Sequence, residues 1–221
     1  MDIHDLQGKK FIASYSGGKD STLAIYRAIN SGLSPLILAT TYNTGVDRSW
    51  VHRISEDLLQ KVSASLSIPI TLVKTTGKQY EENFENVLAA VRNIGAEVCV
   101  FGDIDIEDHL EWCTARCKKT GLIPYFPLWK EERKKLVYEF IDAGFSAIIT
   151  IIDTSRMPKE FLGQILTRET ADSIDKSGTD ICGENGEYHT FTFDGPMFSN
   201  KIDFTVKEKI EKDKYIILDI D

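Results

Sequence analysis

The sequence predicts an α/β fold, in which a parallel sheet with helices on both faces is followed by a smaller α+β domain. In the first half of the chain, short apolar runs alternate with longer amphipathic stretches, and only a few residues separate them. This alternation is typical of a parallel sheet covered by helices. In the second half, strand-like runs follow one another without helices between them, which favours an antiparallel sheet. We place the boundary so that the domains are residues 1–127 and 128–221.

The elements of the first domain follow from local signals. Gly32 stands after the first helix, where a left-handed residue ends a helix well. Ser55 precedes the second helix as an N-cap, and acidic residues fill its first turn. In the third helix, one face carries Phe84, Val87, Leu88 and Val91 at helical spacing. Strands are expected at 11–16, 36–42, 70–75, 97–102 and 123–128, and helices at 20–30, 55–66, 80–95 and 106–121.

The second domain begins with a predicted helix and then becomes rich in strands. The run AIITIID is the longest β-branched run of the chain and predicts a buried strand. The last two strand-like runs are joined by a charged turn, which predicts a hairpin. Helices are expected at 131–144 and 166–178, and strands at 147–153, 187–193, 201–209 and 215–220.

Composition excludes several classes of protein. The 221 residues include 26 Lys+Arg and 34 Asp+Glu, so the formal charge is −8, which argues against broad, non-specific nucleic-acid binding. Acidic residues stand where a signal peptide needs a basic region, and the most apolar run, SAIITII, is too short to span a bilayer. The four cysteines are too few and too scattered for a disulfide framework. We therefore expect a cytoplasmic protein that does not act at a membrane.

The most informative motif is Ser-Gly-Gly-Lys-Asp-Ser at 16–21, directly after the first strand and at the start of the first helix. Two glycines let the backbone approach an anion, and the N–H groups of the helix start converge on it. Lys19 adds a positive charge, Ser16 and Ser21 add hydroxyls, and Asp20 can hold Mg²⁺. It is not the G-x-x-x-x-G-K-[ST] P-loop, because alanine and aspartate stand at two of its defining places. The alternative is a polar turn in which glycines ease a bend.

A second glycine-rich segment spans residues 182–190, with the sequence CGENGEYHT. Its glycines flank Glu184 and Asn185, and Glu187 leads into a predicted strand. Carboxylates at such a bend could position ammonia or accept a proton from an attacking amine. A tight turn before a strand explains the same pattern, and the residues alone leave both interpretations open.

The first motif resembles the SGG-x-DS pyrophosphate loop of the N-type ATP pyrophosphatases. These enzymes cleave ATP between the α and β phosphates and adenylate an oxygen of their substrate. The resemblance implies a Rossmann-like fold of the HUP class, similar to the adenine-nucleotide α-hydrolases. It also implies a nucleotide at the carboxyl ends of the strands, which agrees with the general rule for open α/β sheets.

The second segment resembles the GE-x-GE-[FY]-x-T signature of the diphthine–ammonia ligase family, and DGPMF at 194–198 resembles the D-x-P-[LM]-F tail of that family. Between the two motifs, His52, the GDI run at 102–104 and the stretch from PLW to the AI at 147–148 also match, in order. One departure is visible at Arg133, where the family often has glutamine, and we assign no role to this position.

This resemblance implies an AMP-forming amide ligase. A substrate carboxylate would attack the α-phosphate of ATP·Mg²⁺, and ammonia would then displace AMP. The first domain would bind ATP, and the second would bind the acceptor. Implied nucleotide contacts are Ser14, Ser16, Gly17, Gly18, Lys19, Asp20, Ser21, Thr41, Tyr42, His52, Gly102 and Asp103, with Asp20 also holding Mg²⁺. Glu184, Asn185, Glu187 and His189 would bind acceptor or ammonia. The implied catalytic residues are Lys19, Asp20, Glu184 and Glu187.

The implied acceptor is a carboxylate, in this family that of a modified histidine on a translation elongation factor. A homodimer is a further expectation. Two alternatives compete: another N-type ATP pyrophosphatase that modifies tRNA or amidates a small molecule, and a nucleotide-binding module without catalysis. Cys113 and Cys117, four apart on one predicted helix, could bind a metal, but packing on an apolar face explains them better because no second pair completes a site.

Overall fold

A computed structural model describes residues 3–221 and divides the chain into two compact units. Unit 1 comprises the N-terminal segment through Ser16, then Asp20–Trp50 and Ser67–Lys130. Unit 2 comprises Gly17–Lys19, Val51–Leu66 and Glu131–Asp221. Two short segments of the first half thus group with the second half of the chain, and the main change of unit falls between Lys130 and Glu131. Hydrogen bonds with Thr190 and Thr192 hold Gly17–Lys19 and His52 in this unit, and Ser199 N donates to Ser65 O at 2.9 Å.

Unit 1 is built on a mostly parallel sheet. Its parallel strands are β1 (Lys10–Ser14), β2 (Ser34–Asn43), β4 (Ile70–Thr75), β5 (Val98–Val100) and β6 (Ile123–Tyr125). They lie in the order β4-β2-β1-β5-β6. A two-residue strand that the sequence did not predict, β3 (Arg48–Ser49), pairs antiparallel with the carboxyl end of β2.

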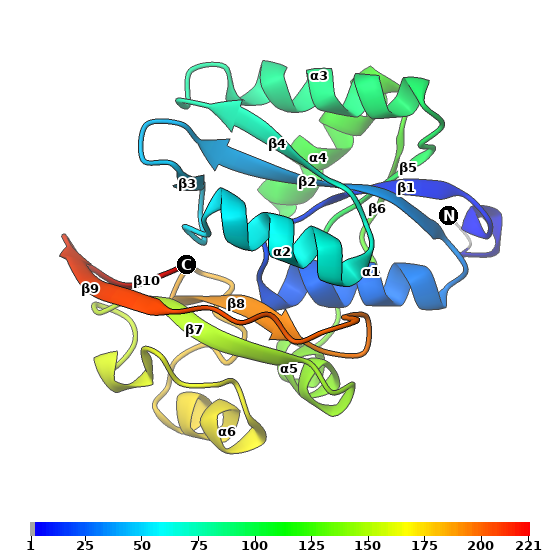
Figure 1. Cartoon of the computed structure of the whole chain (residues 1–221). Helices are drawn as coiled ribbons and strands as arrows, with labels where there is room; N and C mark the ends of the chain where they lie inside the picture. The colour runs from blue at the N-terminus through cyan, green and yellow to red at the C-terminus, as the bar shows by residue number, and fades with distance from the viewer. Residues whose placement is uncertain (1–2) are drawn as a thin grey trace. The chain divides into compact units, whose positions relative to one another are not determined.

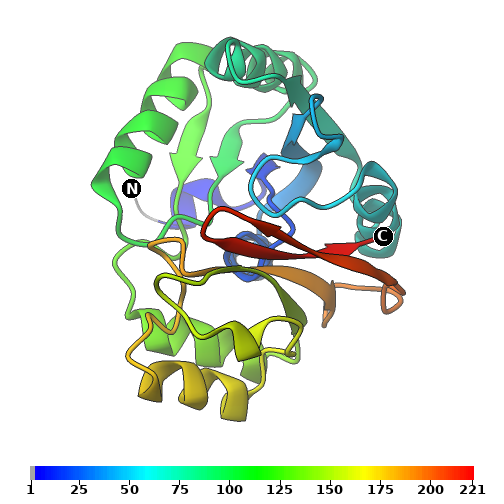
Figure 2. The same ribbon diagram turned by 90° about the vertical axis from the view of Figure 1, so that its left-hand side faces the viewer.

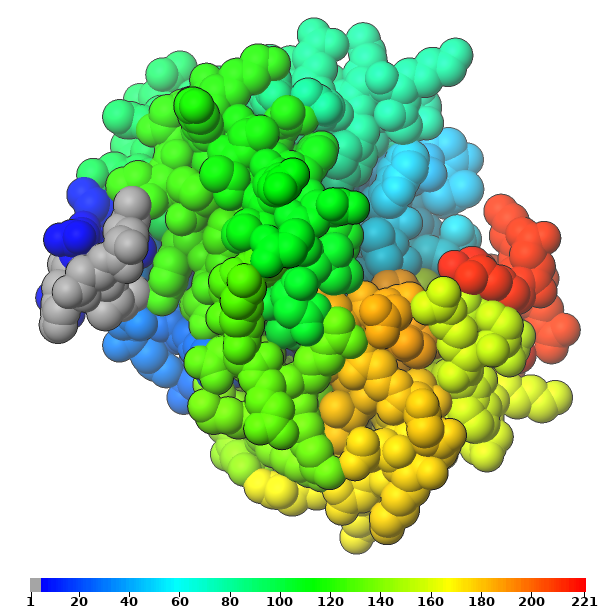
Figure 3. Space-filling model, turned by 180° about the vertical axis from the view of Figure 1, so that it is seen from behind, coloured from blue at the N-terminus to red at the C-terminus, as the bar shows by residue number. Residues whose placement is uncertain are grey.

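Helices cover both faces of this sheet, as predicted. Figure 1 shows α3 (Tyr80–Asn93) and α4 (Glu107–Thr120) on one side of the strands and α1 (Lys19–Asn30) on the other. The core beneath α3 and α4 contains Ile12, Val73, Phe84 and Leu88, all with 2% exposure or less. Residues of α4 lie on the surface that Figure 3 shows in green.

Unit 2 is built on an antiparallel sheet. Its strands are β7 (Ser146–Asp153), β8 (Tyr188–Asp194), β9 (Val206–Lys212) and β10 (Tyr215–Ile220), in the order β8-β7-β10-β9. Helices α5 (Arg133–Asp142) and α6 (Arg168–Lys176) lie together on one side of it, as Figure 2 shows. The second helix of the sequence, α2 (Glu56–Leu66), also belongs to this unit. Short 3₁₀ turns, η1 (Ile3–Leu6) and η2 (Lys159–Phe161), complete the elements.

Several local predictions are confirmed. Ser55 Oγ accepts the Leu58 N–H at 3.2 Å, as an N-cap does. Gly32 has a left-handed φ of 87°. The final hairpin is also present, but β9 begins at Val206 rather than at residue 201. The segment before it is occupied elsewhere, because Ile202 N donates to Phe193 O at 2.8 Å.

The helices of the described residues are all too short or too polar to cross a membrane. The cysteines are buried, and Cys113 and Cys117 lie in the core beneath α3 and α4, as the packing interpretation expects.

Candidate functional site

The parallel sheet of unit 1 has one point at which its strand order reverses. From β1 the chain runs outward through β2 to β4 and then returns to β5, on the other side of β1. Open parallel sheets bind ligands at the carboxyl ends of the strands beside such a reversal. Ser14 ends β1, and Gly102 and Asp103 follow β5. The topology therefore brings these three predicted site residues to one place.

The amino end of α1 lies against the segment that follows β5. A Cβ atom on Gly102 would come within 2.8 Å of the Ser21 nitrogen and 2.9 Å of the Asp20 carbonyl carbon, so this approach requires glycine. The Ser16 and Ser21 hydroxyls are hydrogen-bonded at 3.1 Å, and Ser16 N donates to Ser21 Oγ at 3.3 Å. Because a helix amino end attracts anions, unit 1 presents an anion-binding feature beside the reversal of the strand order.

Asp103 borders a cluster of polar and sulfur-containing side chains. Its Oδ1 lies 3.1 Å from His109 Nδ1, and the Cys113 thiol is 4.0 Å from its Oδ2. Burial, reinforced by the charge of Asp103, raises the pKa of the Cys113 thiol, so the thiol stays protonated at neutral pH. Burial also raises the pKa of Tyr80, whose hydroxyl shares a hydrogen bond with the Thr41 side chain. The sequence did not single out Tyr80, but this residue is a neighbour of Thr41 and Asp103, two predicted nucleotide contacts.

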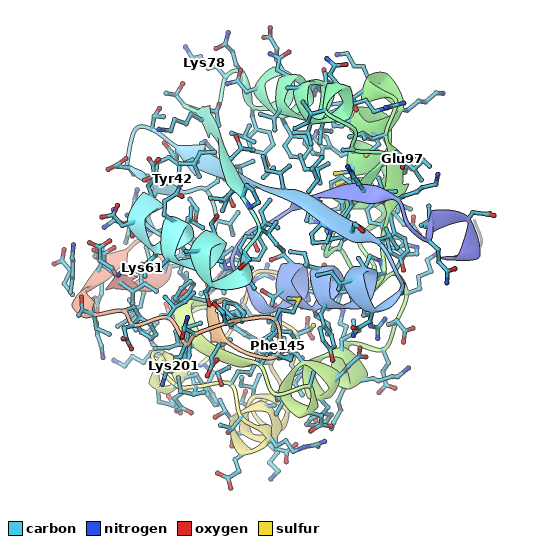
Figure 4. The ribbon with its side chains drawn as sticks, turned by 45° about the vertical axis from the view of Figure 1, so that its right-hand side comes forward. Tyr42, Lys61, Lys78, Glu97, Phe145 and Lys201 are labelled. Atoms are coloured by element: carbon cyan, nitrogen blue, oxygen red, sulfur yellow. The ribbon has the colours of Figure 1, made fainter. Side chains whose placement is uncertain are left out.

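The predicted nucleotide contacts on β2 are already engaged with β3. Thr41 O accepts the Trp50 N–H at 2.9 Å, and Tyr42 pairs with Ser49 in the antiparallel ladder. The Tyr42 side chain, labelled in Figure 4, is buried and donates its hydroxyl to Asp47 Oδ1 at 3.1 Å. These bonds hold the connection between β2 and β3, and a nucleotide role for Thr41 and Tyr42 stays a prediction.

In unit 2, the segment 17–19 of the first motif lies along β8, the strand that follows the second motif. Thr192 N donates to Gly17 O at 2.9 Å, and Lys19 N donates to Thr190 Oγ1 at 3.1 Å. The edge of β8 is therefore paired with the glycine loop. Two motifs that are more than 160 residues apart in the sequence are joined by hydrogen bonds within one compact unit.

Both glycines of the first motif are required by this packing. Gly17 has a φ of 85°, and a Cβ atom there would overlap the Ile54 side chain. A Cβ atom on Gly18 would overlap the His52 ring. From the sequence, these glycines are expected to permit the close approach of an anion, and the structure adds a second reason, which is the approach of the Ile54 and His52 side chains.

The ammonium group of Lys19 is held by the second motif. Lys19 is buried, and its Nζ donates a hydrogen bond to the carbonyl oxygen of Cys182. The ring of Tyr188 lies 5.3 Å from the same nitrogen, within the range of a cation–π interaction. A buried ammonium needs such partners, because its desolvation is costly.

His52, a predicted nucleotide contact, and His189, a predicted acceptor contact, lie beside each other. Their ring centroids are 4.9 Å apart. His52 Nδ1 is 2.7 Å from Thr190 O, so this nitrogen carries the proton and donates. Burial lowers the pKa of His189 to about 3, with smaller contributions from His52 and Lys19, and His189 is therefore neutral at physiological pH.

Within the second motif, Glu187 stabilises its own loop. The buried carboxylate accepts the Asn185 N–H at 3.0 Å and the Asn185 side-chain amide at 3.2 Å. Asp153 N donates to Glu187 O at 2.9 Å, which fixes the start of β8. Glu184, by contrast, is half-buried. The Glu187 side chain thus has a structural role, and a role toward ammonia or an acceptor stays a prediction.

Asp180, which the sequence did not single out, and Arg133, to which it assigned no role, organise this loop. Asp180 Oδ1 accepts the Cys182 N–H and Asp180 Oδ2 accepts the Glu184 N–H, both at 3.0 Å. Arg133 Nη1 donates to Asp180 Oδ2 at 2.5 Å. The sequence carried one signal for Asp180, because an aspartate side chain often accepts the backbone N–H of the residue two positions later, here Cys182.

The donors near the first motif suit a metal that is carried by phosphates. Asp20 supplies a half-buried carboxylate in the first turn of α1, and Ser16 and Ser21 supply hydroxyl oxygens. Mg²⁺ commonly binds through one or two carboxylates, phosphates and water. In the part of the chain that the structure describes, no three His, Cys, Asp or Glu side chains gather as a metal cage. The donor set therefore fits Mg²⁺ bound together with a nucleotide.

Comparisons with known proteins agree over nearly the whole chain. The profile described as "Diphthamide synthase N-terminal domain" matches residues 9–124, and "Diphthamide synthase C-terminal domain" matches residues 132–221.

Curated relatives carry one name, "Diphthine--ammonia ligase". The Danio rerio protein is 23% identical, with 91% of this chain and 88% of that protein covered, and the Homo sapiens protein is 25% identical, with 86% and 80% covered. The Schizosaccharomyces pombe protein is 22% identical over 91% of this chain, and the matched region is 37% of the length of that protein. Among solved structures, "predicted subunit of tRNA methyltransferase" from Methanocaldococcus jannaschii aligns with 88% of this chain and 100% of that chain, at 15% identity and a TM-score of 0.45.

Proposed function

Because this chain belongs to the diphthamide synthase family, we propose that it is an ATP-dependent ligase that forms AMP and joins ammonia to a carboxylate. The relatives named diphthine–ammonia ligase support this proposal at 22% to 25% identity across most of the chain. The proposed acceptor is the carboxylate of diphthine, the modified histidine of a translation elongation factor.

The proposed nucleotide site consists of residues 16–21 and the carboxyl ends of β1 and β5. The amino end of α1 and the Lys19 ammonium bind the phosphates and stabilise the negative charge that grows on them as the α-phosphate is attacked. Asp20 would hold Mg²⁺, which would supply further charge neutralisation. The acceptor carboxylate attacks the α-phosphate in line, and pyrophosphate leaves. An acyl adenylate results, and ammonia then attacks its carbonyl carbon and expels AMP.

In the proposed acceptor site, Glu184, Asn185, Glu187 and His189 orient ammonia or the acceptor. Glu184 is the candidate to accept a proton from the attacking nitrogen, because its side chain is only half-buried, whereas Glu187 is buried and its carboxylate stabilises its own loop. Neutral His189 is suited to a hydrogen-bonding role rather than to pairing with a carboxylate.

One observation carries the proposal: Lys19 of the first motif is bonded to Cys182 and Thr190 of the second. A turn that merely eases a strand-to-helix bend would not need a buried lysine. A two-step ligase does need a phosphate-binding loop and an acceptor loop that are held together, because both reactions use the same α-phosphate and carbonyl centre.

The test is a product analysis with purified protein, MgATP, ammonium and an elongation factor that carries diphthine. We expect AMP and pyrophosphate in equal amounts, and we expect both to depend on the acceptor. Lys19→Ala and Asp20→Ala should each reduce the rate at least about 100-fold. Lys78→Ala removes an exposed lysine elsewhere and serves as the matched control.

The other outcomes separate the alternatives. Formation of ADP and phosphate would contradict the assignment to the N-type ATP pyrophosphatases. AMP formation with tRNA or a small carboxylic acid, but not with the elongation factor, would favour a different acceptor. Tight ATP binding without turnover under any of these conditions would favour a nucleotide-binding module.

A further inference from the structure

We infer that Asp180, paired with Arg133, is a positioning residue that directs the Cys182 carbonyl toward the Lys19 ammonium. The importance of this positioning for catalysis rests on the proposed phosphate role of Lys19. All of the groups concerned lie in unit 2. Asp180 itself lies outside both sequence motifs.

Asp180 fixes the loop through backbone hydrogen bonds. Its carboxylate accepts two backbone N–H groups, those of Cys182 and Glu184, one on each oxygen and both at 3.0 Å. Its own carbonyl oxygen accepts the Gly183 N–H, also at 3.0 Å. Three successive backbone N–H groups of the loop therefore end on one residue.

The hydrogen bond from Gly183 N to Asp180 also sets the direction of the Cys182 carbonyl. In a trans peptide, the C=O and N–H of one unit point in opposite directions. The Gly183 N–H belongs to the same peptide unit as the Cys182 carbonyl, and it points at Asp180. The carbonyl must therefore point away from Asp180, and the group that it meets is the Lys19 ammonium.

Packing leaves the loop little freedom. Gly183 has a φ of 68°, and a Cβ atom there would come within 2.8 Å of the Tyr188 ring. The Tyr188 hydroxyl donates to Ile181 O at 2.6 Å, and the same ring lies 5.3 Å from Lys19 Nζ. The loop and this ring together enclose the lysine head group.

The charge of Asp180 is balanced by Arg133. Its side chain is only 13% exposed, so its charge needs compensation, which the Arg133 guanidinium supplies at 2.5 Å from Oδ2. Arg133 is the first residue of α5 and is therefore held by a helix. The arrangement runs from α5 through Asp180 and the Cys182 peptide to Lys19.

The experiment measures how fast Lys19 reacts with a small amine-acylating reagent, by mass spectrometry of peptides from the folded protein. Lys19 should react slowly in the wild type, because its ammonium is buried and bonded. In Asp180→Asn, the side-chain amide can accept only one of the two N–H groups and no longer neutralises Arg133. We expect the rate of Lys19 to rise about tenfold or more.

Two controls separate positioning from general destabilisation. Lys214, whose ammonium lies 2.6 Å from Asp153 in the same unit, is the reference lysine within each molecule, and its rate should not change. Asp175→Asn, on α6, breaks an exposed ion pair with Lys134, which is the neighbour of Arg133 on α5. This substitution removes no hydrogen bond to a backbone amide of the loop. This variant should leave the Lys19 rate at the wild-type value.

A second variant covers the case in which Asp180→Asn does not fold. Arg133→Gln keeps the Asp180 carboxylate and removes only its charge partner, so Lys19 should react faster than in the wild type, and Arg133→Lys should restore most of the protection. An unchanged Lys19 rate in folded Asp180→Asn or Arg133→Gln protein would overturn the inference. An equal rise in Asp175→Asn, or an equal rise at Lys214, would also overturn it.

The same variants report on catalysis. With the acceptor present, Asp180→Asn should lower kcat for AMP formation more than it raises KM for MgATP. Because the acylation rate needs neither ATP nor acceptor, it remains informative if the wild type makes no AMP. In that case the proposed function fails while the positioning of Lys19 is still decided.

Discussion

His189 makes the stability of the protein sensitive to acid. Its pKa falls from 6.5, the ordinary value, to about 3 in the folded chain, chiefly through burial and further through His52 and Lys19. Below pH 6.5 the unfolded chain binds a proton at this residue and the folded chain does not. The stabilisation that comes from a neutral His189 is therefore complete above pH 6.5 and is lost progressively as the pH falls toward 3.

The size of this effect follows from the two pKa values. Each pH unit within the window changes the free energy of unfolding by at most about 1.4 kcal/mol. Between pH 7 and pH 5, the contribution of His189 should cost about 2 kcal/mol. The assay is urea unfolding at a series of pH values, for the wild type and for His189→Asn, which cannot titrate in this range.

Subtraction of the two curves isolates His189, since other titrating groups are common to both proteins. We expect the wild type to lose about 2 kcal/mol more than the variant between pH 7 and pH 5. Parallel curves would refute the reasoning, because they would mean that the pKa of His189 is not depressed in the folded protein. A steeper loss in the variant would refute it as well.

Three further predictions concern single contacts. Gly102→Ala should destabilise the protein by about 1–3 kcal/mol and weaken ATP binding, because the new methyl group meets backbone atoms that cannot rotate away. Urea unfolding measures the stability and calorimetry the ATP affinity, and unchanged values would contradict the close approach. Ser55→Ala should cost about 1 kcal/mol in urea unfolding through loss of the cap on Leu58 N, whereas a neutral effect would show that the cap does not contribute. Glu187→Gln replaces one of the carboxylate oxygens that hold Asn185, so it should loosen the proposed acceptor loop and lower the product-forming rate ~100-fold while calorimetric ATP affinity stays near the wild-type value. Loss of ATP affinity with an intact fold would instead place Glu187 on the nucleotide.

Patterns within a few residues were enough to predict most of the elements. The alternation of apolar runs and amphipathic stretches gave the parallel sheet, because burial on both faces requires continuous apolar strands. Caps such as Ser55 and left-handed glycines such as Gly32 are local effects, and they were predicted correctly. β3 was missed because two residues carry no periodicity, and the start of β9 was misplaced because hydrogen bonds to distant segments decide it.

The sequence by itself determined that two glycine-rich motifs exist and which chemistry their residue types allow, since a glycine, a lysine and a carboxylate have the same properties in any fold. Only the tertiary structure decided what these residues contact. It placed Gly17–Lys19 along β8, turned the Cys182 carbonyl toward Lys19 and brought His52 beside His189. It also gave a contact to Arg133, to which the sequence assigned no role, and introduced its partner Asp180. The physical reason is range: backbone preferences act over a few neighbouring residues, whereas burial, charge pairing and shifts in pKa depend on groups that only the folded chain brings together.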